Sequence, residues 1–165
     1  MAKTPEAMNS TFVDTKLKAA GLVRPWKIHD SFSVGKPDSE YIRRDGNAGR
    51  VLKIEYKFMA ELPKRDSTII TPSWANELQR VRLGEYFDTD GNAWAVIFVG
   101  RNDADCIVLC NKDEWDNGIT TATARTRLIK RKDLAAMITY WVTKGEFGHL
   151  TIPFRTTNGN LGAFA

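Results

Sequence analysis

The spacing of apolar residues along the chain predicts three helices. Over residues 5–20, apolar side chains recur every three or four positions, as on one face of a helix, and a glycine follows directly as a stop. A second helix is predicted over 72–86, where Thr71 is placed to cap it and Pro72 stands at the first helical position. A third helix is predicted over 133–143. The expected apolar stripes are Met8, Phe12, Val13 and Leu17 in the first helix, Trp74, Leu78 and Val81 in the second, and Leu134, Ile138, Trp141 and Val142 in the third.

Runs rich in β-branched and aromatic residues, some of them alternating with polar ones, predict strands between these helices. In chain order the runs are 26–32, 38–43, 51–58, 93–99, 106–110 and 151–154. The second and third runs flank the turn-rich segment 45–49, as the two arms of a hairpin do. The order α-β-β-β-α-β-β-α-β predicts a mixed α/β fold, in which helices pack on a hairpin-rich sheet.

The composition is that of a globular protein of ordinary size. The chain has 165 residues, 42% of them hydrophobic and 27% charged, and no apolar run approaches the ~18 residues that cross a bilayer. We expect one domain over 1–155 and a flexible Gly/Asn-rich tail over 156–165. The N-terminus has no apolar signal core, and two cysteines cannot supply a disulfide framework, so a cytoplasmic location is expected.

The positive charge of the chain is local. Five basic residues lie between positions 125 and 132, and they outnumber the whole chain's net charge of +4, so the remainder carries a slight negative excess. They are Arg125, Arg127, Lys130, Arg131 and Lys132. Such a cluster can neutralise the phosphates of a nucleic acid, and it can equally form a solvated basic turn.

The segment 51–58 carries the candidate chemistry. Side chains alternate along a strand, so Leu52, Ile54, Tyr56 and Phe58 share an apolar face, and Val51, Lys53, Glu55 and Lys57 share the other. A two-residue turn at Gly46-Asn47 makes opposed positions sum to 93, which places Asp38 opposite Glu55 and Glu40 opposite Lys53. Two opposed carboxylates destabilise a sheet unless a cation neutralises them, and Mg²⁺ prefers such oxygen ligands.

A second register would place Asp45 opposite Glu55. It requires a turn centred on Arg50 and removes Val51 and Leu52 from the strand. It also leaves the turn-forming residues 45–47 outside the turn. Asp38 is therefore the preferred partner of Glu55.

The stretch Val34-Gly35-Lys36-Pro37-Asp38, a hairpin, and then Val51-Leu52-Lys53-Ile54-Glu55-Tyr56-Lys57 resembles the PD-(D/E)XK nuclease signature. The version here is similar to that of small phage and archaeal junction-resolving nucleases and of VRR-NUC nucleases. The resemblance implies a restriction-endonuclease-like αβββαβ core, a central mixed sheet flanked by helices. It also implies that Asp38, Glu55 and the backbone carbonyl of Tyr56 hold the metal and that Lys57 positions or deprotonates the attacking water. A Glu from the first helix joins the site in many members, and Glu6 is the candidate here, with Asp14 as the alternate.

The function expected from these residues is a metal-dependent DNA endonuclease that hydrolyses phosphodiester bonds in branched or structured DNA, as a phage-encoded Holliday junction resolvase does. Mg²⁺ is the expected cofactor, and Mn²⁺ is expected to substitute for it. Gln79 and Arg80 on the second helix are expected to contact the nucleic acid together with the basic cluster. Cutting both strands symmetrically requires two sites, which favours a homodimer. Two alternatives stay open: a sequence-specific type II restriction-like endonuclease, and a non-catalytic nucleic-acid- or protein-binding module on a nuclease-like fold.

Overall fold

The first helix forms where its end signals predict. The computed structural model describes residues 3–27, 36–44, 50–74, 77–90, 92–101, 104–144, 154–155 and 161–162. Helix α1 (Pro5–Ala20) begins after Thr4, whose hydroxyl accepts the Ala7 N–H, and it ends at Gly21, which adopts the left-handed conformation at φ 75°. Its buried face is half polar, since Met8 is exposed and the buried residues are Asn9, Ser10, Val13, Asp14 and Leu17.

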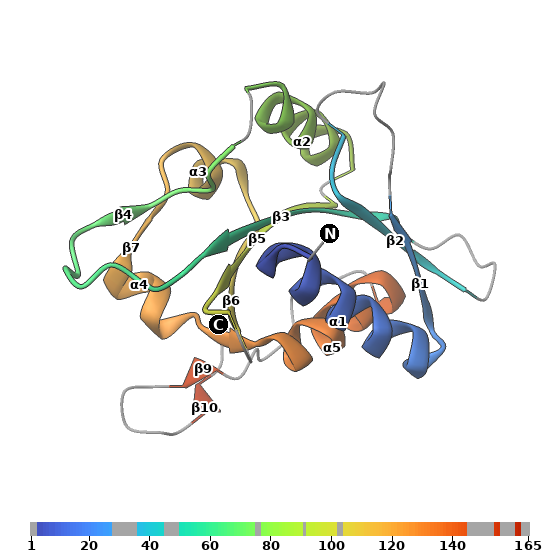
Figure 1. The fold of residues 1–165 in the computed structure, drawn as a ribbon. Coiled ribbons are helices and arrows are strands. Elements are labelled where there is room, and N and C mark those ends of the chain that lie inside the picture. The colour runs from blue at the N-terminus through green and yellow to red at the C-terminus, as the bar shows by residue number, and fades with distance from the viewer. Residues whose placement is uncertain are drawn as a thin grey trace.

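A curled six-stranded sheet forms the centre of the molecule (Figure 1), which confirms the mixed α/β class. Its strands lie in the order β1 (Val23–Lys27), β2 (Ser39–Arg43), β3 (Leu52–Met59), β5 (Ala93–Val99), β6 (Asp105–Leu109) and β8 (Ile129–Lys130). Strands β3 and β5 are parallel, and helix α2 (Glu77–Asp90) lies between them in sequence, as a parallel crossover requires. The other neighbouring pairs are antiparallel.

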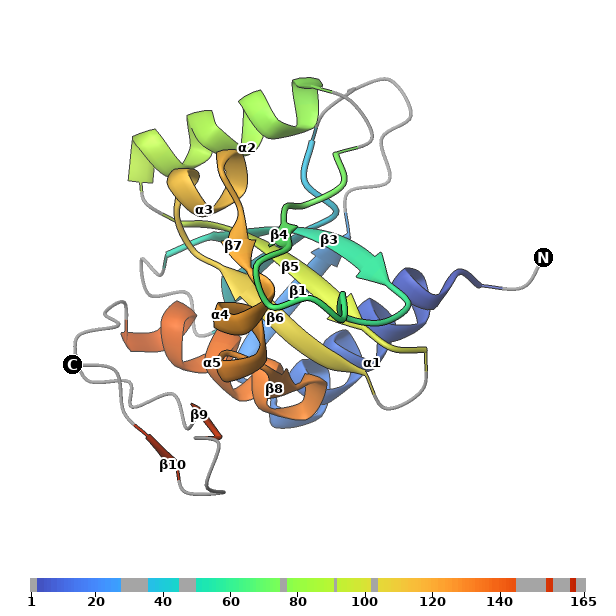
Figure 2. The same ribbon diagram turned by 90° about the vertical axis from the view of Figure 1, so that its left-hand side faces the viewer.

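Both faces of the sheet are covered, each over its own apolar cluster (Figure 2). Helices α1 and α5 (Arg131–Lys144) cover the face that carries Leu52, Ile54 and Tyr56 of β3. The opposite face lies beneath α2, α3 (Lys112–Asp116), α4 (Thr121–Thr126) and the short ribbon of β4 (Ile69–Ile70) with β7 (Ile119–Thr120). The short elements α4, β4, β7 and β8 were not predicted from the sequence.

The edge strand β1 begins earlier than predicted. The sequence pattern placed it at 26–32, whereas the strand spans Val23–Lys27, and 28–32 lie outside the described residues. Pro25 hides the strand signal because proline lacks the N–H that a central strand needs, but an edge strand tolerates it. Strands β2, β3 and β6 lie within one residue of their predicted bounds, and β5 matches at both ends.

Helix α2 also departs from its prediction. Residues 71–74 are not helical, 75–76 lie outside the described residues, and the helix is described from Glu77. The expected stripe is wrong too, since Leu78 and Val81 are 39% and 43% exposed while Leu83 is buried. The preceding ribbon bears on the late start of the helix: Ile70 pairs with Ile119 in β4, and residues 71–74 after it belong to no helix or strand.

Helix α5 confirms the third predicted helix and its stripe, since Leu134, Ile138, Trp141 and Val142 are all buried. Near the C-terminus, β9 (Phe154–Arg155) pairs with β10 (Leu161–Gly162), and the remaining residues after 144 lie outside the described part of the chain. Among the described helices, none is long and apolar enough to cross a membrane.

Candidate functional site

The register between β2 and β3 is the one predicted from the turn. Ser39 pairs with Ile54 and Glu40 with Lys53, so opposed positions sum to 93. One step further along, Asp38 stands opposite Glu55. The register that would oppose Asp45 and Glu55 does not occur, and Asp45 itself lies outside the described residues.

Pro37 and Asp38 end the ladder in a way that shapes the site. The Asp38 Oδ2 accepts the Tyr56 backbone N–H at 2.7 Å, in place of a ladder bond to β2. The N–H and C=O of one strand residue point toward the same neighbouring strand, so the Tyr56 carbonyl faces the Asp38 side as well. Its ladder partner at position 37 is a proline, which carries no N–H to donate. Pro37 therefore cannot donate to the Tyr56 carbonyl, an oxygen of the kind that can serve as a metal ligand.

Glu55 and Lys57 meet on the face beneath α2. The Lys57 Nζ donates to the Glu55 Oε1 at 2.6 Å and to the Gln79 Oε1 at 3.2 Å. It also lies 5.8 Å from the centroid of the Trp74 ring. Glu55 is 1% exposed and Lys57 7%, so this charged pair is buried rather than solvated. Burial of an ion pair costs desolvation energy, so the pair need not add to the stability of the fold.

Burial and like charges perturb the carboxyl groups. Burial, then the charge of Asp38, raises the pKa of Glu55 from 4.5 to about 7, against the opposing effect of Lys57. Burial likewise raises the pKa of Asp38, although the Tyr56 N–H, Lys57 and Lys27 act to lower it. Buried carboxyls with raised pKa values beside an ammonium group are typical of functional sites.

Helix α1 brings Glu6 to the same place. Burial raises the pKa of Glu6, and so does the charge of Asp38, while Lys57 lowers it. The alternate residue, Asp14, is engaged elsewhere: it accepts the Tyr41 hydroxyl at 3.0 Å and pairs with Lys27 at 3.3 Å. Of the two candidates, Glu6 is therefore the one within electrostatic range of Asp38. Together with Asp38, Glu55 and Lys57 it forms what we term the carboxyl cluster.

Two residues near the cluster were missed by sequence reasoning. Lys27, opposite Ser39 in the register, acts on Asp38 electrostatically, and Trp74 covers Lys57. Lys27 could have been found by extending the register one strand further. Trp74 could not have been found, because the sequence pattern places it in a helix, whereas the structure places it before the helix.

The donor set suits a hard cation in part. Asp38, Glu55 and the Tyr56 carbonyl supply oxygen ligands of the kind that Mg²⁺ takes, with water completing its shell. Among the described residues, no group of three or more His, Cys, Asp or Glu side chains is placed to hold a metal ion by itself. The residues that fit are thus two carboxylates and one backbone carbonyl.

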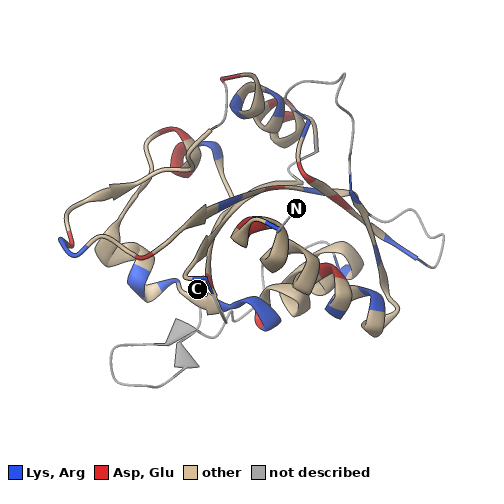
Figure 3. Cartoon of the chain, viewed as in Figure 1, with Lys and Arg blue, Asp and Glu red and all other residues tan. Residues whose placement is uncertain are grey.

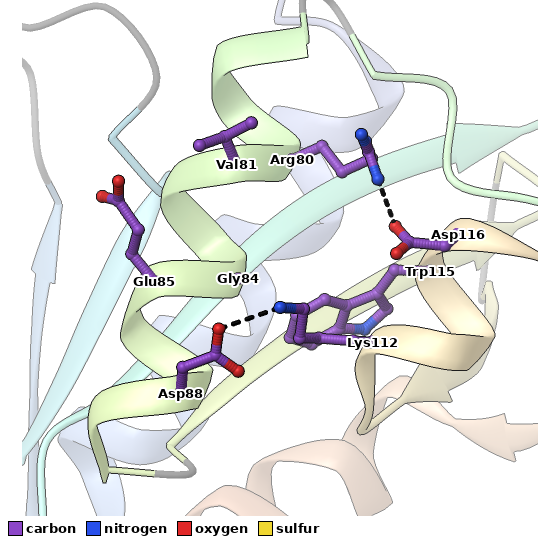
Figure 4. A pocket seen from close by; sticks show the side chains of 8 residues that line it. All are labelled: Arg80, Val81, Gly84, Glu85, Asp88, Lys112, Trp115 and Asp116. Carbon is purple, nitrogen blue, oxygen red and sulfur yellow. Dashed lines mark hydrogen bonds and ion pairs between the residues drawn. The ribbon is translucent and has the colours of Figure 1, made fainter.

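Gln79 joins the site, but Arg80 points away from it. The Arg80 guanidinium bonds to Glu77 on its own helix and to Asp116 at 2.7 Å, and it lines a hollow of about 290 Å³ between α2 and α3 (Figure 4). Lys112 and Asp88 form a second ion pair across the same hollow at 2.8 Å. The two carboxylates on Arg80 compete with any phosphate for its donors.

The basic cluster of 125–132 is engaged within the molecule as well. Arg125 pairs with Asp66, Arg127 with Glu114, and Lys130 with Asp105, whereas Arg131 donates to the Asn9 Oδ1 at 2.7 Å. Lys132 is exposed at the start of α5. Figure 3 shows Lys and Arg spread over several elements of the fold rather than gathered on this segment. Nucleic-acid binding by the 125–132 cluster stays a prediction.

Comparison with known proteins leaves the family open. No protein-family model matches this chain, and no curated protein sequence matches it.

Proposed function

We propose that this protein is a metal-dependent DNA endonuclease whose site is the carboxyl cluster. The observation that carries the proposal is the convergence of Asp38 and Glu55 from adjacent strands, with the Lys57 ammonium beside them. The resemblance of the Pro37-Asp38 and Glu55-Tyr56-Lys57 segments to the PD-(D/E)XK signature supports the same function and a restriction-endonuclease-like core. Branched or structured DNA is the substrate class that the resemblance favours.

Each residue has a role that follows from its position. Asp38, Glu55 and the Tyr56 carbonyl would hold Mg²⁺, which when bound supplies a Lewis acid and an activated water. The Lys57 ammonium is a hydrogen-bond donor, and it stabilises negative charge that develops next to it. Gln79 fixes the Lys57 ammonium from the helix side. Glu6 adds a third carboxyl within electrostatic range.

Access to the site requires a rearrangement of what covers it. Glu55 is almost wholly buried, and Trp74 and Gln79 lie against Lys57, whereas Asp38 is only half-buried. A phosphodiester therefore approaches from the Asp38 side, and the Trp74 and Gln79 side chains shift to admit it.

The test is cleavage of linear, nicked and four-way-junction DNA by the purified protein with Mg²⁺ or Mn²⁺. We expect Asp38→Asn and Glu55→Gln to lower the single-turnover rate by about 100- to 1,000-fold, the loss typical of a removed electrostatic group. Glu85→Gln is the matched control, because Glu85 is an exposed carboxylate on α2 that pairs with Arg82. A chelator should abolish cleavage. Uncut substrates throughout, or variants that cut as fast as the wild type, would reject the enzyme.

The burial of Glu55 favours one second candidate, a nuclease-like fold that binds nucleic acid without cutting it. A sealed carboxylate–ammonium pair needs no metal to neutralise it, since Lys57 already lies 2.6 Å from Glu55. Metal-independent binding without cleavage of any of the DNA forms above would select this candidate.

A further inference from the structure

The sheet face that carries Glu55 and Lys57 continues onto β1 and β2. Directly opposed residues of antiparallel strands share a face, and Trp26 pairs with Glu40, which pairs with Lys53. Lys53 lies over the Tyr86 ring of α2, 4.3 Å from its centroid, so this is the face beneath α2. By alternation, Arg24, Trp26, Ile42 and Arg44 belong to it as well.

On β1 this face presents an aromatic ring and cations to solvent. Trp26 is 51% exposed, and the Arg24 guanidinium lies 5.1 Å from its ring centroid. With Ile42, Arg43 and Arg44, these residues line a hollow of about 510 Å³. The Arg43 guanidinium reaches the other face, where it donates to the Thr143 carbonyl, so Arg24 and Arg44 are the cations of this surface.

The charge balance here differs from that of the 125–132 cluster. Arg24 and Arg44 form no ion pair with any acidic side chain in the described part of the chain, whereas Arg125, Arg127 and Lys130 each do. Glu40 is the one acidic residue in the sequences of β1 and β2, and it lies opposite Lys53. The surface is therefore positive and aromatic, a combination that suits an anionic chain carrying flat bases.

The distance to the carboxyl cluster matches a short length of nucleic acid. Ile42, which pairs with Arg24, lies four positions after Asp38, and at ~3.3 Å per residue this spans about 13 Å. At the ~3.4 Å rise of a fully stacked strand this distance corresponds to about four nucleotides, and an unstacked strand covers it with fewer. Trp26 lies between the two, next to Lys27, in position to stack on a base along the way.

We propose that Arg24, Trp26 and Arg44 form a binding platform for an unpaired segment of the substrate strand, with a base stacked on Trp26 and phosphates on the two arginines. The platform rests on the proposed function for its substrate class and deepens it. An exposed indole stacks on the face of an unpaired base, which a duplex keeps within its own stack. The platform selects DNA with single-stranded or branched character.

Binding is measured in EDTA, so that it does not depend on cleavage, with a 12-nucleotide single strand and its duplex as probes. Stacking on the most exposed described tryptophan should quench tryptophan fluorescence, and Trp26→Phe should abolish the quench while keeping most of the affinity. Trp26→Ala should weaken single-strand binding about tenfold or more. Arg24→Gln and Arg44→Gln should each lower the slope of log affinity against log salt by about 0.7. Arg82→Gln is the matched control, because Arg82 is an exposed arginine on α2 that pairs with Glu85, and it should leave the slope unchanged.

The outcomes separate this inference from the nuclease itself. Trp26→Ala binding as tightly as wild type, or duplex binding as tightly as the single strand, overturns the platform even if the protein cuts DNA. Loss of binding in the Trp26 and arginine variants of a protein that cuts nothing supports the platform and rejects the nuclease. Failure of the wild type to bind either probe overturns the platform. Circular dichroism confirms that each variant folds, which the exposure of Trp26 leads us to expect.

Discussion

Two polar clusters lie on the two faces of β3, and they differ in their balance of acidic and basic groups. On the α1 side, the tyrosine network comprises Asp14, Lys27, Tyr41 and Tyr56. The Tyr41 hydroxyl lies 3.0 Å from Asp14 and 2.6 Å from the Tyr56 hydroxyl, and Lys27 pairs with Asp14. Burial raises the pKa of both tyrosines well above their usual value, so they stay neutral. One carboxylate faces one ammonium, and the network is balanced.

The carboxyl cluster is not balanced. Glu6, Asp38 and Glu55 lie within electrostatic range of the Lys57 ammonium, and Lys27 also acts on Asp38, yet the pKa values of all three carboxyls rise. A sheet built for stability alone would replace such groups with apolar ones, which pack without a desolvation cost. The comparison shows two kinds of buried polarity: the tyrosine network links α1 to the sheet through balanced contacts, whereas the carboxyl cluster gathers more carboxyl than ammonium groups.

The largest expected contrast is in activity. Lys57→Met should lower the single-turnover rate of DNA cleavage about 100- to 1,000-fold, because the ammonium beside the carboxyls is lost. Tyr41→Phe removes a hydroxyl from the tyrosine network and should change the rate less than about threefold. Both rates are measured on the best DNA substrate, with the folded fraction checked by circular dichroism. Equal losses in the two variants would erase the distinction between the clusters.

The second contrast is in stability, with the order reversed. Asp14→Ala removes the carboxylate that accepts from the buried Tyr41 hydroxyl and pairs with the half-buried Lys27, so the free energy of unfolding should fall by about 1–3 kcal/mol. Glu55→Gln keeps an acceptor for Lys57 and removes a buried negative charge, so at pH 8 the free energy of unfolding should not fall. Urea denaturation measures both. A large loss in Glu55→Gln would show that Glu55 stabilises the fold after all.

A third contrast is a dependence of stability on pH. The pKa of Glu55 is about 7 in the folded protein, above its ordinary value of 4.5, so between these values the folded state binds more protons than the unfolded chain. Without metal, the free energy of unfolding should therefore fall as the pH rises through this window and stay low above it. Glu77, whose pKa Arg80 lowers, titrates below the window.

Asp38→Asn should shift this fall to lower pH, because the charge of Asp38 is the second largest cause of the raised Glu55 pKa. Denaturation in urea at pH 5, 6, 7 and 8 with EDTA measures the profile, and Asp116→Asn is the control on the far side of α2. A flat wild-type profile would contradict the assignment of the raised pKa to Glu55.

The site was predictable from sequence where its contacts are local. The 38/55 register followed from a turn signal and from alternation, because a hairpin brings nearby residues together by a fixed rule. The caps of α1 were equally local. The long-range ion pairs of Arg80, Arg125 and Arg127 were not predictable, because their acidic partners lie 13 to 59 residues away in sequence. A sequence pattern does not show which distant carboxylate meets which arginine. The start of β1 was missed for a different reason: Pro25 has no backbone N–H, so it argues against a strand unless the strand lies at an edge.

Pro37 limits which substitutions the site can tolerate. A backbone ligand belongs to no side chain, so no substitution at Tyr56 deletes its carbonyl. A donor-bearing residue in place of Pro37 would instead supply an N–H to that oxygen and lengthen β2 across the opening. Pro37 thus keeps the end of the β2–β3 ladder open beside the oxygen ligands of the proposed metal site. A substitution of Pro37 by a residue with an N–H would close the site while leaving every acidic residue in place.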